Sequence, residues 1–274
     1  MNKVLCPVDF SDASLNALEF ASAIAKKYQC KITLIHVFTE KDFNRIVGEE
    51  AYGKSFKELL ALASTRLSAL ADTLCNGDTI QCDYRIELGE LTNQIQSLVE
   101  DEHYDYIVMG TTGVSKTNGI YFGSQTEEVI DKIKTPVMCI PEQAAFTGFH
   151  NLVYASDYAE EDKLAIQDVI SFATFFDSRI NVLHINQDDR EVQYKQFVEE
   201  LKSFIQYSKI SFTNKEFKGA VGLGIEEYMQ KERADLLVVF KQHRNFVSSI
   251  FHKSLTKTLA YSTDKPLLVL KLGA

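Results

Sequence analysis

Short apolar runs alternate, in the first half of the chain, with segments in which apolar residues recur every three or four positions. The runs lie at residues 3–8, 31–38, 80–88, 106–109 and 135–140. Each run has the length of a buried β-strand. Between the first two runs, Leu15, Leu18 and Ala21 recur at the spacing of one helix face. This alternation predicts an α/β fold, in which a parallel, doubly wound sheet is flanked by helices.

The second half of the chain repeats this pattern. Val4–Asp9 aligns with Leu152–Asp157, and the same spacing separates His36 from His184. The repeat predicts two tandem domains, at residues 1–143 and 149–274, joined by a short linker. Two equivalent histidines inside apolar runs are interpreted as core residues rather than as ligands.

The repeat is not uniform, because its later segments align at a shorter spacing. Asp105 aligns with Asp235 and Pro136 with Pro266, so the first half contains about 18 extra residues before Asp105. We place this insertion in the long helical region around residues 40–68.

A glycine-rich loop follows the run at 106–109. Its glycines are Gly110, Gly113 and Gly123, and Ser124 comes directly after the third, where a helical pattern begins. Glycine lets backbone N–H groups approach an anion, and a helix N-terminus offers unpaired N–H donors. Open α/β sheets bind ligands at this end of their strands. The loop therefore predicts a phosphate site, although an ordinary glycine-rich turn is the alternative.

The second half does not copy this loop. The three glycines are replaced there by Phe240, His243 and Lys253, and only the serine is retained, as Ser254. A phenylalanine at the end of the strand would obstruct a nucleotide. The two halves are therefore predicted to share a scaffold but not a site.

Charge and composition exclude several classes of protein. The net charge of −9 argues against a general nucleic-acid binder, which needs a basic face. No apolar run approaches the roughly 18 residues that cross a membrane, and Asp9 comes too early for a signal peptide. The five cysteines are odd in number and lack CxxC spacing, which favours reduced thiols in the cytoplasm.

These features resemble the universal stress protein family, with two such domains covering nearly the whole chain. The pattern Gly110-x2-Gly113-x9-Gly123-Ser124 matches the signature loop of the ATP-binding branch of that family. The opening strand, which ends in Pro7-Val8-Asp9, matches the family's start. The resemblance implies that each domain is a five-stranded parallel sheet of order 3-2-1-4-5, with helices on both faces.

The resemblance also implies a nucleotide site in the first domain. Asp9 would meet the adenine or ribose end, where Pro7, Val8 and Val37 shape the pocket, although Asp9 could instead cap the following helix. Met109 and Gly110 would line the floor. The phosphates would lie against the loop and the next helix, at Gly113, Gly123, Ser124, Gln125 and Thr126.

The ligand implied is ATP, or ADP or AMP, with any Mg²⁺ held mainly by phosphates and water because no acidic pair lies near the loop. The function implied is that of an ATP-binding regulatory protein of the stress response. A slow ATPase or autophosphorylating protein and a nucleotide-free interaction protein are the alternatives. No catalytic motif is present that specifies an efficient enzyme.

Association is expected through the last strands, as in family dimers. In a tandem chain, Val137–Ile140 could pair with Leu267–Leu270 to give an intramolecular pseudo-dimer, and a homodimer of such chains is also open. A basic segment at residues 241–257 is interpreted as a solvated surface, with docking of an acidic partner or another anion as the alternative. The protein partner itself is unknown.

Overall fold

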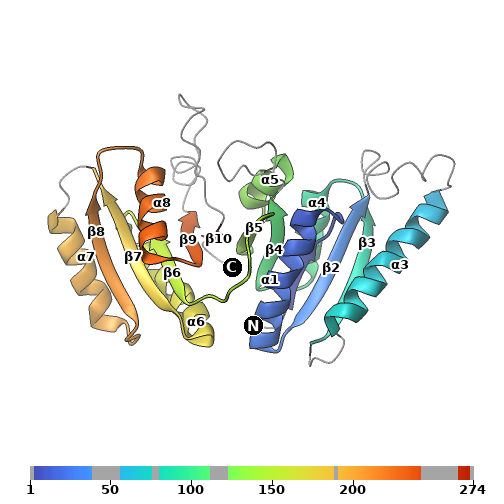
Figure 1. Cartoon of the computed structure of the whole chain (residues 1–274), viewed down its shortest axis with the longest axis horizontal. Helices are drawn as coiled ribbons and strands as arrows, with labels where there is room; N and C mark the ends of the chain where they lie inside the picture. Colours follow the sequence, from blue (N-terminus) through green and yellow to red (C-terminus); the bar gives the residue numbers. More distant parts are fainter. Residues whose placement is uncertain are drawn as a thin grey trace. The chain divides into compact units, whose positions relative to one another are not determined.

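The computed structural model describes residues 3–38, 56–75, 80–111, 123–187, 191–241 and 265–271. It contains two compact units, and the chain passes from the first to the second between Gln143 and Ala144 (Figure 1). Among the described residues, no helix is both long enough and apolar enough to cross a membrane.

The described part of the first unit contains five parallel strands. They are β1 (Lys3–Pro7), β2 (Lys31–Phe38), β3 (Cys82–Leu88), β4 (Tyr106–Thr111) and β5 (Val137–Pro141). Their spatial order is β3-β2-β1-β4-β5, which confirms the expected order 3-2-1-4-5. β1 is central: its Leu5 lies opposite Thr33 of β2 on one side and opposite Ile107 of β4 on the other.

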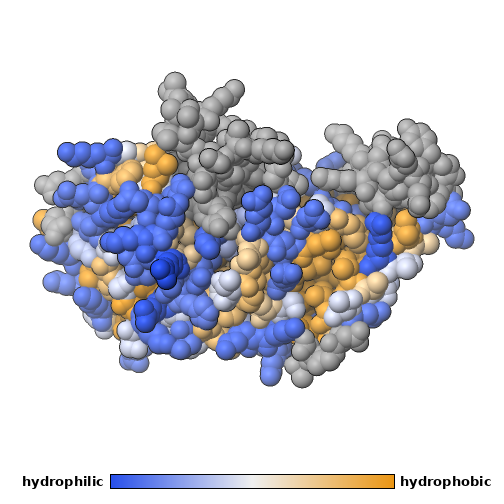
Figure 2. Space-filling model, in the orientation of Figure 1, coloured by the Kyte–Doolittle hydropathy of each residue, from blue (hydrophilic) through white to orange (hydrophobic). Residues whose placement is uncertain are grey.

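Four described helices flank this sheet. They are α1 (Asp12–Tyr28), α3 (Phe56–Cys75), α4 (Leu91–Asp101) and α5 (Ser124–Lys132). Right-handed connections place α1 and α3 on one face of the sheet, and α4 and α5 on the other. In the view of Figure 1, α1 and α3 lie in front of the strands, and Figure 2 shows apolar residues gathered between these two helices.

The burial of α1 agrees with the predicted apolar stripe except at its first position. Leu18 and Ala21 are at most 4% exposed, whereas Leu15 is 37% exposed and lies at the margin of the buried face. Ser11 is the N-cap of the helix, and its side-chain oxygen accepts a hydrogen bond from the backbone N–H of Ser14. The buried face begins with small residues of the first turn, including Ser14 itself.

The second unit repeats the first. Its described strands are β6 (Asn151–Ala155), β7 (Arg179–Asn186), β8 (Ile210–Glu216), β9 (Leu236–Lys241) and β10 (Leu267–Lys271). Its described helices are α6 (Asp162–Phe176), α7 (Glu191–Phe204) and α8 (Val221–Glu232). The strand order is β8-β7-β6-β9-β10, again 3-2-1-4-5.

The two units differ in length between their second and third strands. Helix α3 has 20 residues and its counterpart α7 has 14. The rest of the predicted insertion falls at residues 39–55, which lie outside the described residues.

The equivalent histidines make the same contact in both units. His36 is 2% exposed and its Nδ1 lies 2.6 Å from the carbonyl oxygen of Val8. His184 is 8% exposed and its Nδ1 lies 2.8 Å from the carbonyl oxygen of Ser156. Each histidine therefore ties the second strand of its sheet to the end of the first, as a buried core residue.

Candidate functional site

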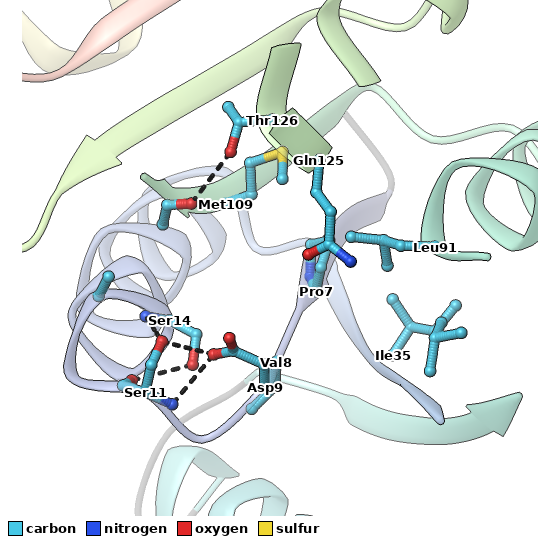
Figure 3. Close-up of a pocket in the computed structure, with 13 residues that line it drawn as sticks. Pro7, Val8, Asp9, Ser11, Ser14, Ile35, Leu91, Met109, Gln125 and Thr126 are labelled. Atoms are coloured by element: carbon cyan, nitrogen blue, oxygen red, sulfur yellow. Dashed lines mark hydrogen bonds between the residues drawn. The ribbon is translucent and has the colours of Figure 1, made fainter. Parts of the chain in front are cut away.

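A cleft lies at the carboxyl ends of the first unit's strands, between the N-termini of α1 and α5 (Figure 3). It gathers eight of the eleven residues predicted from the sequence: Pro7, Val8, Asp9, Val37, Met109, Gly110, Gln125 and Thr126. These residues come from three strands and one helix that are far apart in the sequence. The fold therefore brings most of the predicted set to one place.

The other three predicted residues are not part of the cleft's described lining. Gly123 and Ser124 lie at the start of α5, where Gly123 is the N-cap. Gly113 lies outside the described residues. The roles assigned to these three residues stay predictions.

Five further residues line the cleft that the sequence analysis did not select: Ser11, Ala13, Ser14, Ile35 and Leu91. Ile35 could have been found, because alternation along β2 puts it on the same face as Val37. The two serines lie two and five residues after Asp9, at the start of a helix. Leu91 gave no such signal, because only the crossover to α4 brings it here.

One end of the cleft is apolar. Val8, Ile35 and Val37 are at most 8% exposed, and Leu91 at the start of α4 completes this wall. The cleft encloses about 60 Å³. That is far below the roughly 300–1,000 Å³ of typical small-molecule pockets, so a large ligand needs space beyond the enclosed part.

Asp9 lies at the polar side of the cleft and shapes the start of α1. Its Oδ1 accepts hydrogen bonds from the backbone N–H of Ser11 at 3.0 Å and from the Ser11 hydroxyl at 2.5 Å. Ser11 in turn accepts from the backbone N–H of Ser14 at 3.3 Å. Ser11 is therefore the residue that caps α1, and Asp9 supports this cap instead of capping the helix itself.

Gly110 is required by the packing of α1 against β4. A Cβ at this position would lie 2.4 Å from the carbonyl oxygen of Ala13 and 2.8 Å from the backbone nitrogen of Ser14. The first turn of α1 therefore packs directly on the backbone of β4. This contact gives Gly110 a packing role within the cleft's lining, and the role suggested by the loop pattern stays a prediction.

The start of α5 forms the opposite side of the cleft. Its N-cap, Gly123, provides no side-chain hydrogen bond to the first-turn N–H groups. Thr126 is 3% exposed, and its hydroxyl donates to the carbonyl oxygen of Gly110 at 3.5 Å. Figure 3 shows the Gln125 side chain pointing from α5 toward Pro7 and Leu91, at the apolar end.

The equivalent region of the second unit holds a buried carboxyl group. By the spacing of the repeat, Asp162 corresponds to Ser14, and it is only 3% exposed. Its Oδ2 accepts from the Ser156 hydroxyl at 2.6 Å, and the Tyr154 hydroxyl donates to Oδ1. Burial raises the pKa of Asp162 to about 6. When ionised, this carboxylate would repel a phosphate.

Phe240 in the second unit occupies the position of Gly110 and is 5% exposed. A phenylalanine leaves no room for a helix turn packed on the strand backbone as α1 packs on β4. Accordingly, α6 begins at Asp162, whereas α1 begins at Asp12, which is two residues earlier in the repeat. His243, Lys253 and Ser254 of the second loop lie outside the described residues.

A divalent cation at the cleft would need a set of suitable ligands. Within the ranges that the structure describes, no group of three or more His, Cys, Asp or Glu side chains could hold a metal ion. A divalent cation at the cleft would therefore depend on ligands other than such a cluster.

Comparison with known proteins identifies similar chains. The model of the universal stress protein family matches residues 1–141. Universal stress protein MJ0531 of Methanocaldococcus jannaschii is 28% identical over 50% of this chain and 81% of its own. Universal stress protein MJ0577 of the same organism is 26% identical over 50% of this chain and 93% of its own.

One solved structure extends the likeness to both units. A universal stress protein from Archaeoglobus fulgidus superposes with a TM-score of 0.79 and covers 99% of each chain, at 19% sequence identity. At this identity the match speaks for the fold alone, and it covers the second unit as well as the first.

Proposed function

Because this chain belongs to the universal stress protein family, we propose that it is an ATP-binding regulatory protein of the stress response. The nucleotide is held in the first domain, residues 1–143. The second domain, residues 149–274, has a degenerate loop and serves pseudo-dimer formation or binding of a protein partner. The bound nucleotide fixes a conformation that the partner recognises.

The main support is the convergence of distant segments on one cleft. Residues near positions 8, 36, 109 and 125 line the same space at the carboxyl end of a parallel sheet. This is the position at which open α/β sheets bind ligands. The arrangement is also asymmetric, because the second unit replaces Ser14 and Gly110 by Asp162 and Phe240.

The residues of the cleft fit the parts of an adenine nucleotide. The apolar wall of Val8, Ile35 and Val37 suits a flat base, and the carboxylate of Asp9 can accept from ribose hydroxyls or an amino group. The first-turn N–H groups of α5 suit phosphates. Because the enclosed volume is small, we expect the phosphates to lie toward Gly123 and Ser124, beyond the enclosed part.

A bound nucleotide would bring negative charge and a phosphoanhydride to the start of α5. The chain's own contribution is to orient that group through the N–H donors at Gly123 and Ser124. Mg²⁺, if bound, would be held mainly by phosphate oxygens and water.

The test is the identity of any small molecule that copurifies with the protein from cells. After denaturation and removal of the chain, the supernatant is analysed by chromatography with mass detection. We expect ATP, ADP or AMP. Protein that releases no adenine nucleotide, and that does not bind added ATP, would instead be a nucleotide-free interaction protein.

The second function that we consider is that of a slow ATPase or an autophosphorylating protein. Ser124, in the first turn of α5 where the phosphates are expected, or a neighbouring hydroxyl would be the phosphoryl acceptor. Appearance of ADP from added ATP, or of phosphate on the chain, would separate this function from simple binding.

Location and assembly complete the proposal. We place the protein in the cytoplasm, where its cysteines stay reduced. We also propose that Val137–Ile140 pairs with Leu267–Leu270 of the same chain, which gives a pseudo-dimer that can associate further into a homodimer.

A further inference from the structure

The free cysteines of the first unit fall into two groups by exposure. Cys6, Cys30 and Cys139 are buried, whereas Cys75 and Cys82 are half-buried. The second group lies at a junction between two elements, because Cys75 is the last residue of α3 and Cys82 is the first residue of β3.

Periodicity places Cys75 on the side of α3 that faces the sheet. Ala63, Leu67 and Ala71 recur every four residues along α3 and are at most 7% exposed. Cys75 is the next position in this series, so it continues the same stripe at the end of the helix.

Alternation places Cys82 on the face of β3 that α3 covers. Tyr84 and Ile86 lie on that face, because the Tyr84 hydroxyl is 3.0 Å from that of Ser64, and Ile86 packs against the core cluster that includes Ala63. Cys82 precedes them by two and four residues and therefore faces the same way.

Cys75 lies close enough to Cys82 to influence the ionisation of its thiol. The pKa of Cys82 is raised to about 12, first by burial, then by the charge of Cys75 and by hydrogen bonding with the Cys75 side chain. Two free thiols on facing surfaces, within reach of one another and half-buried, form a pair that can be oxidised.

We propose that Cys75 and Cys82 are a redox-active pair, which forms a reversible disulfide when the protein meets hydrogen peroxide. The pair is separate from the cleft and shares none of its lining residues. The disulfide would covalently link the end of α3 to the start of β3.

The reaction balances with one peroxide per disulfide. The thiolate of Cys75 attacks a peroxide oxygen, the O–O bond breaks, and the departing hydroxide takes a proton to become water. Cys82 stays a thiol until this point because its pKa is high. It then loses its proton and attacks the sulfenic sulfur of Cys75, the S–O bond breaks, and a second water leaves. Two thiols are oxidised by two electrons, and the peroxide is reduced to two waters.

Peptide mapping provides a sharp test, since trypsin cleavage after Arg66 and Arg85 leaves both cysteines on one peptide. The full-length reduced protein is treated with hydrogen peroxide, blocked with iodoacetamide and digested without reductant. We expect this peptide to appear unalkylated and two hydrogens lighter than its dithiol form. Reduction before alkylation should restore two alkylated cysteines.

Two variants distinguish a specific disulfide between Cys75 and Cys82 from general oxidation of thiols. Cys82→Ser should abolish the disulfide-containing peptide, and Cys75 should then be oxidised to sulfinic acid. The control Cys30→Ser should form the disulfide as the wild type does. A peptide that keeps two alkylatable thiols after peroxide treatment would overturn the proposal. So would a disulfide that joins either cysteine to a different partner.

Discussion

Gly110 illustrates, at the scale of one residue, how an absent side chain sets the geometry of the cleft. A Cβ at Gly110 would lie 2.4 Å from the carbonyl oxygen of Ala13, so the backbone of Ala13 occupies the space that a side chain would need. The first turn of α1, with Ser11 and Ser14, is therefore held against β4 and lines the cleft. In the second unit, Phe240 occupies this position, and helix α6 begins two residues later in the repeat than α1 does.

We predict that Gly110→Ala destabilises the protein, because either β4 or the start of α1 must shift to admit the methyl group. Overpacking of this kind costs about 1–3 kcal/mol. Urea unfolding measures the loss. Leu15→Ala, on the helix that packs against Gly110, serves as a control because Leu15 is 37% exposed. Equal stability of Gly110→Ala and wild type would show that the close contact is relieved without cost.

The aspartates that follow the first strands of the two units provide a matched pair. Ser11 donates its backbone N–H to Asp9 at 3.0 Å, and Ala159 donates its backbone N–H to Asp157 at 3.3 Å. Both residues thus support the turn that follows, but only Asp9 is assigned to a nucleotide.

We predict that Asp9→Asn lowers the affinity for ATP by at least tenfold, since a hydrogen bond to a charged group contributes about 1.5–3 kcal/mol. Asp157→Asn should leave the affinity unchanged. Isothermal titration of both variants measures the difference. Equal losses in the two variants would point to an effect on folding rather than on the site.

Asp162 predicts a dependence of stability on pH. Its pKa is about 6 in the folded chain, against about 3.9 for an unperturbed aspartate, because burial disfavours the charged form. The folded state therefore holds the proton more tightly. The stabilisation of the folded state by this proton is complete below pH about 4. It is lost as the pH rises through about 6.

Asp162→Asn should remove this dependence. Between pH 4.5 and 7.5, the wild type should lose on the order of 2 kcal/mol of unfolding free energy relative to the variant. Urea unfolding of both proteins at the two pH values measures this change. A stability difference between them that does not vary with pH would contradict the raised pKa.

At the scale of elements, the hydrophobic pattern was sufficient for the strands, whereas their order followed from the resemblance to the family. The predicted run at 31–38 coincides with β2, and the other four strands of the first unit overlap their predicted runs. Periodicity could not predict which helices contribute residues to the cleft. Leu91 enters the cleft from α4 and Ser14 from α1, and both placements depend on crossover geometry rather than on any local pattern.

The start of α5 is the element on which phosphate binding depends. We predict that Gly123→Val abolishes ATP binding, because a branched side chain at the N-cap blocks access to the first-turn N–H groups. Circular dichroism should show an intact fold, and Val192→Ala, at a residue 76% exposed in the second unit, serves as a control. Undiminished affinity in Gly123→Val would remove α5 from the site.

At the scale of the whole molecule, the sequence repeat predicts the second sheet and the replaced loop predicts its loss of a phosphate site. The buried Asp162, with Tyr154 and Ser156 around it, was not predicted. The repeat aligns Asp162 with Ser14, but nothing in the sequence indicates that this carboxyl group is buried and hydrogen-bonded. The duplication has therefore kept the topology while changing the chemistry of one copy.

The stoichiometry of ATP binding tests the asymmetry between the two units most directly. Purified full-length protein, freed of any copurified ligand, is titrated with ATP and Mg²⁺ in a calorimeter. We predict one nucleotide per chain, bound in the first unit. Two nucleotides per chain would show that the second unit also binds, and no binding at all would show that the cleft is not a nucleotide site.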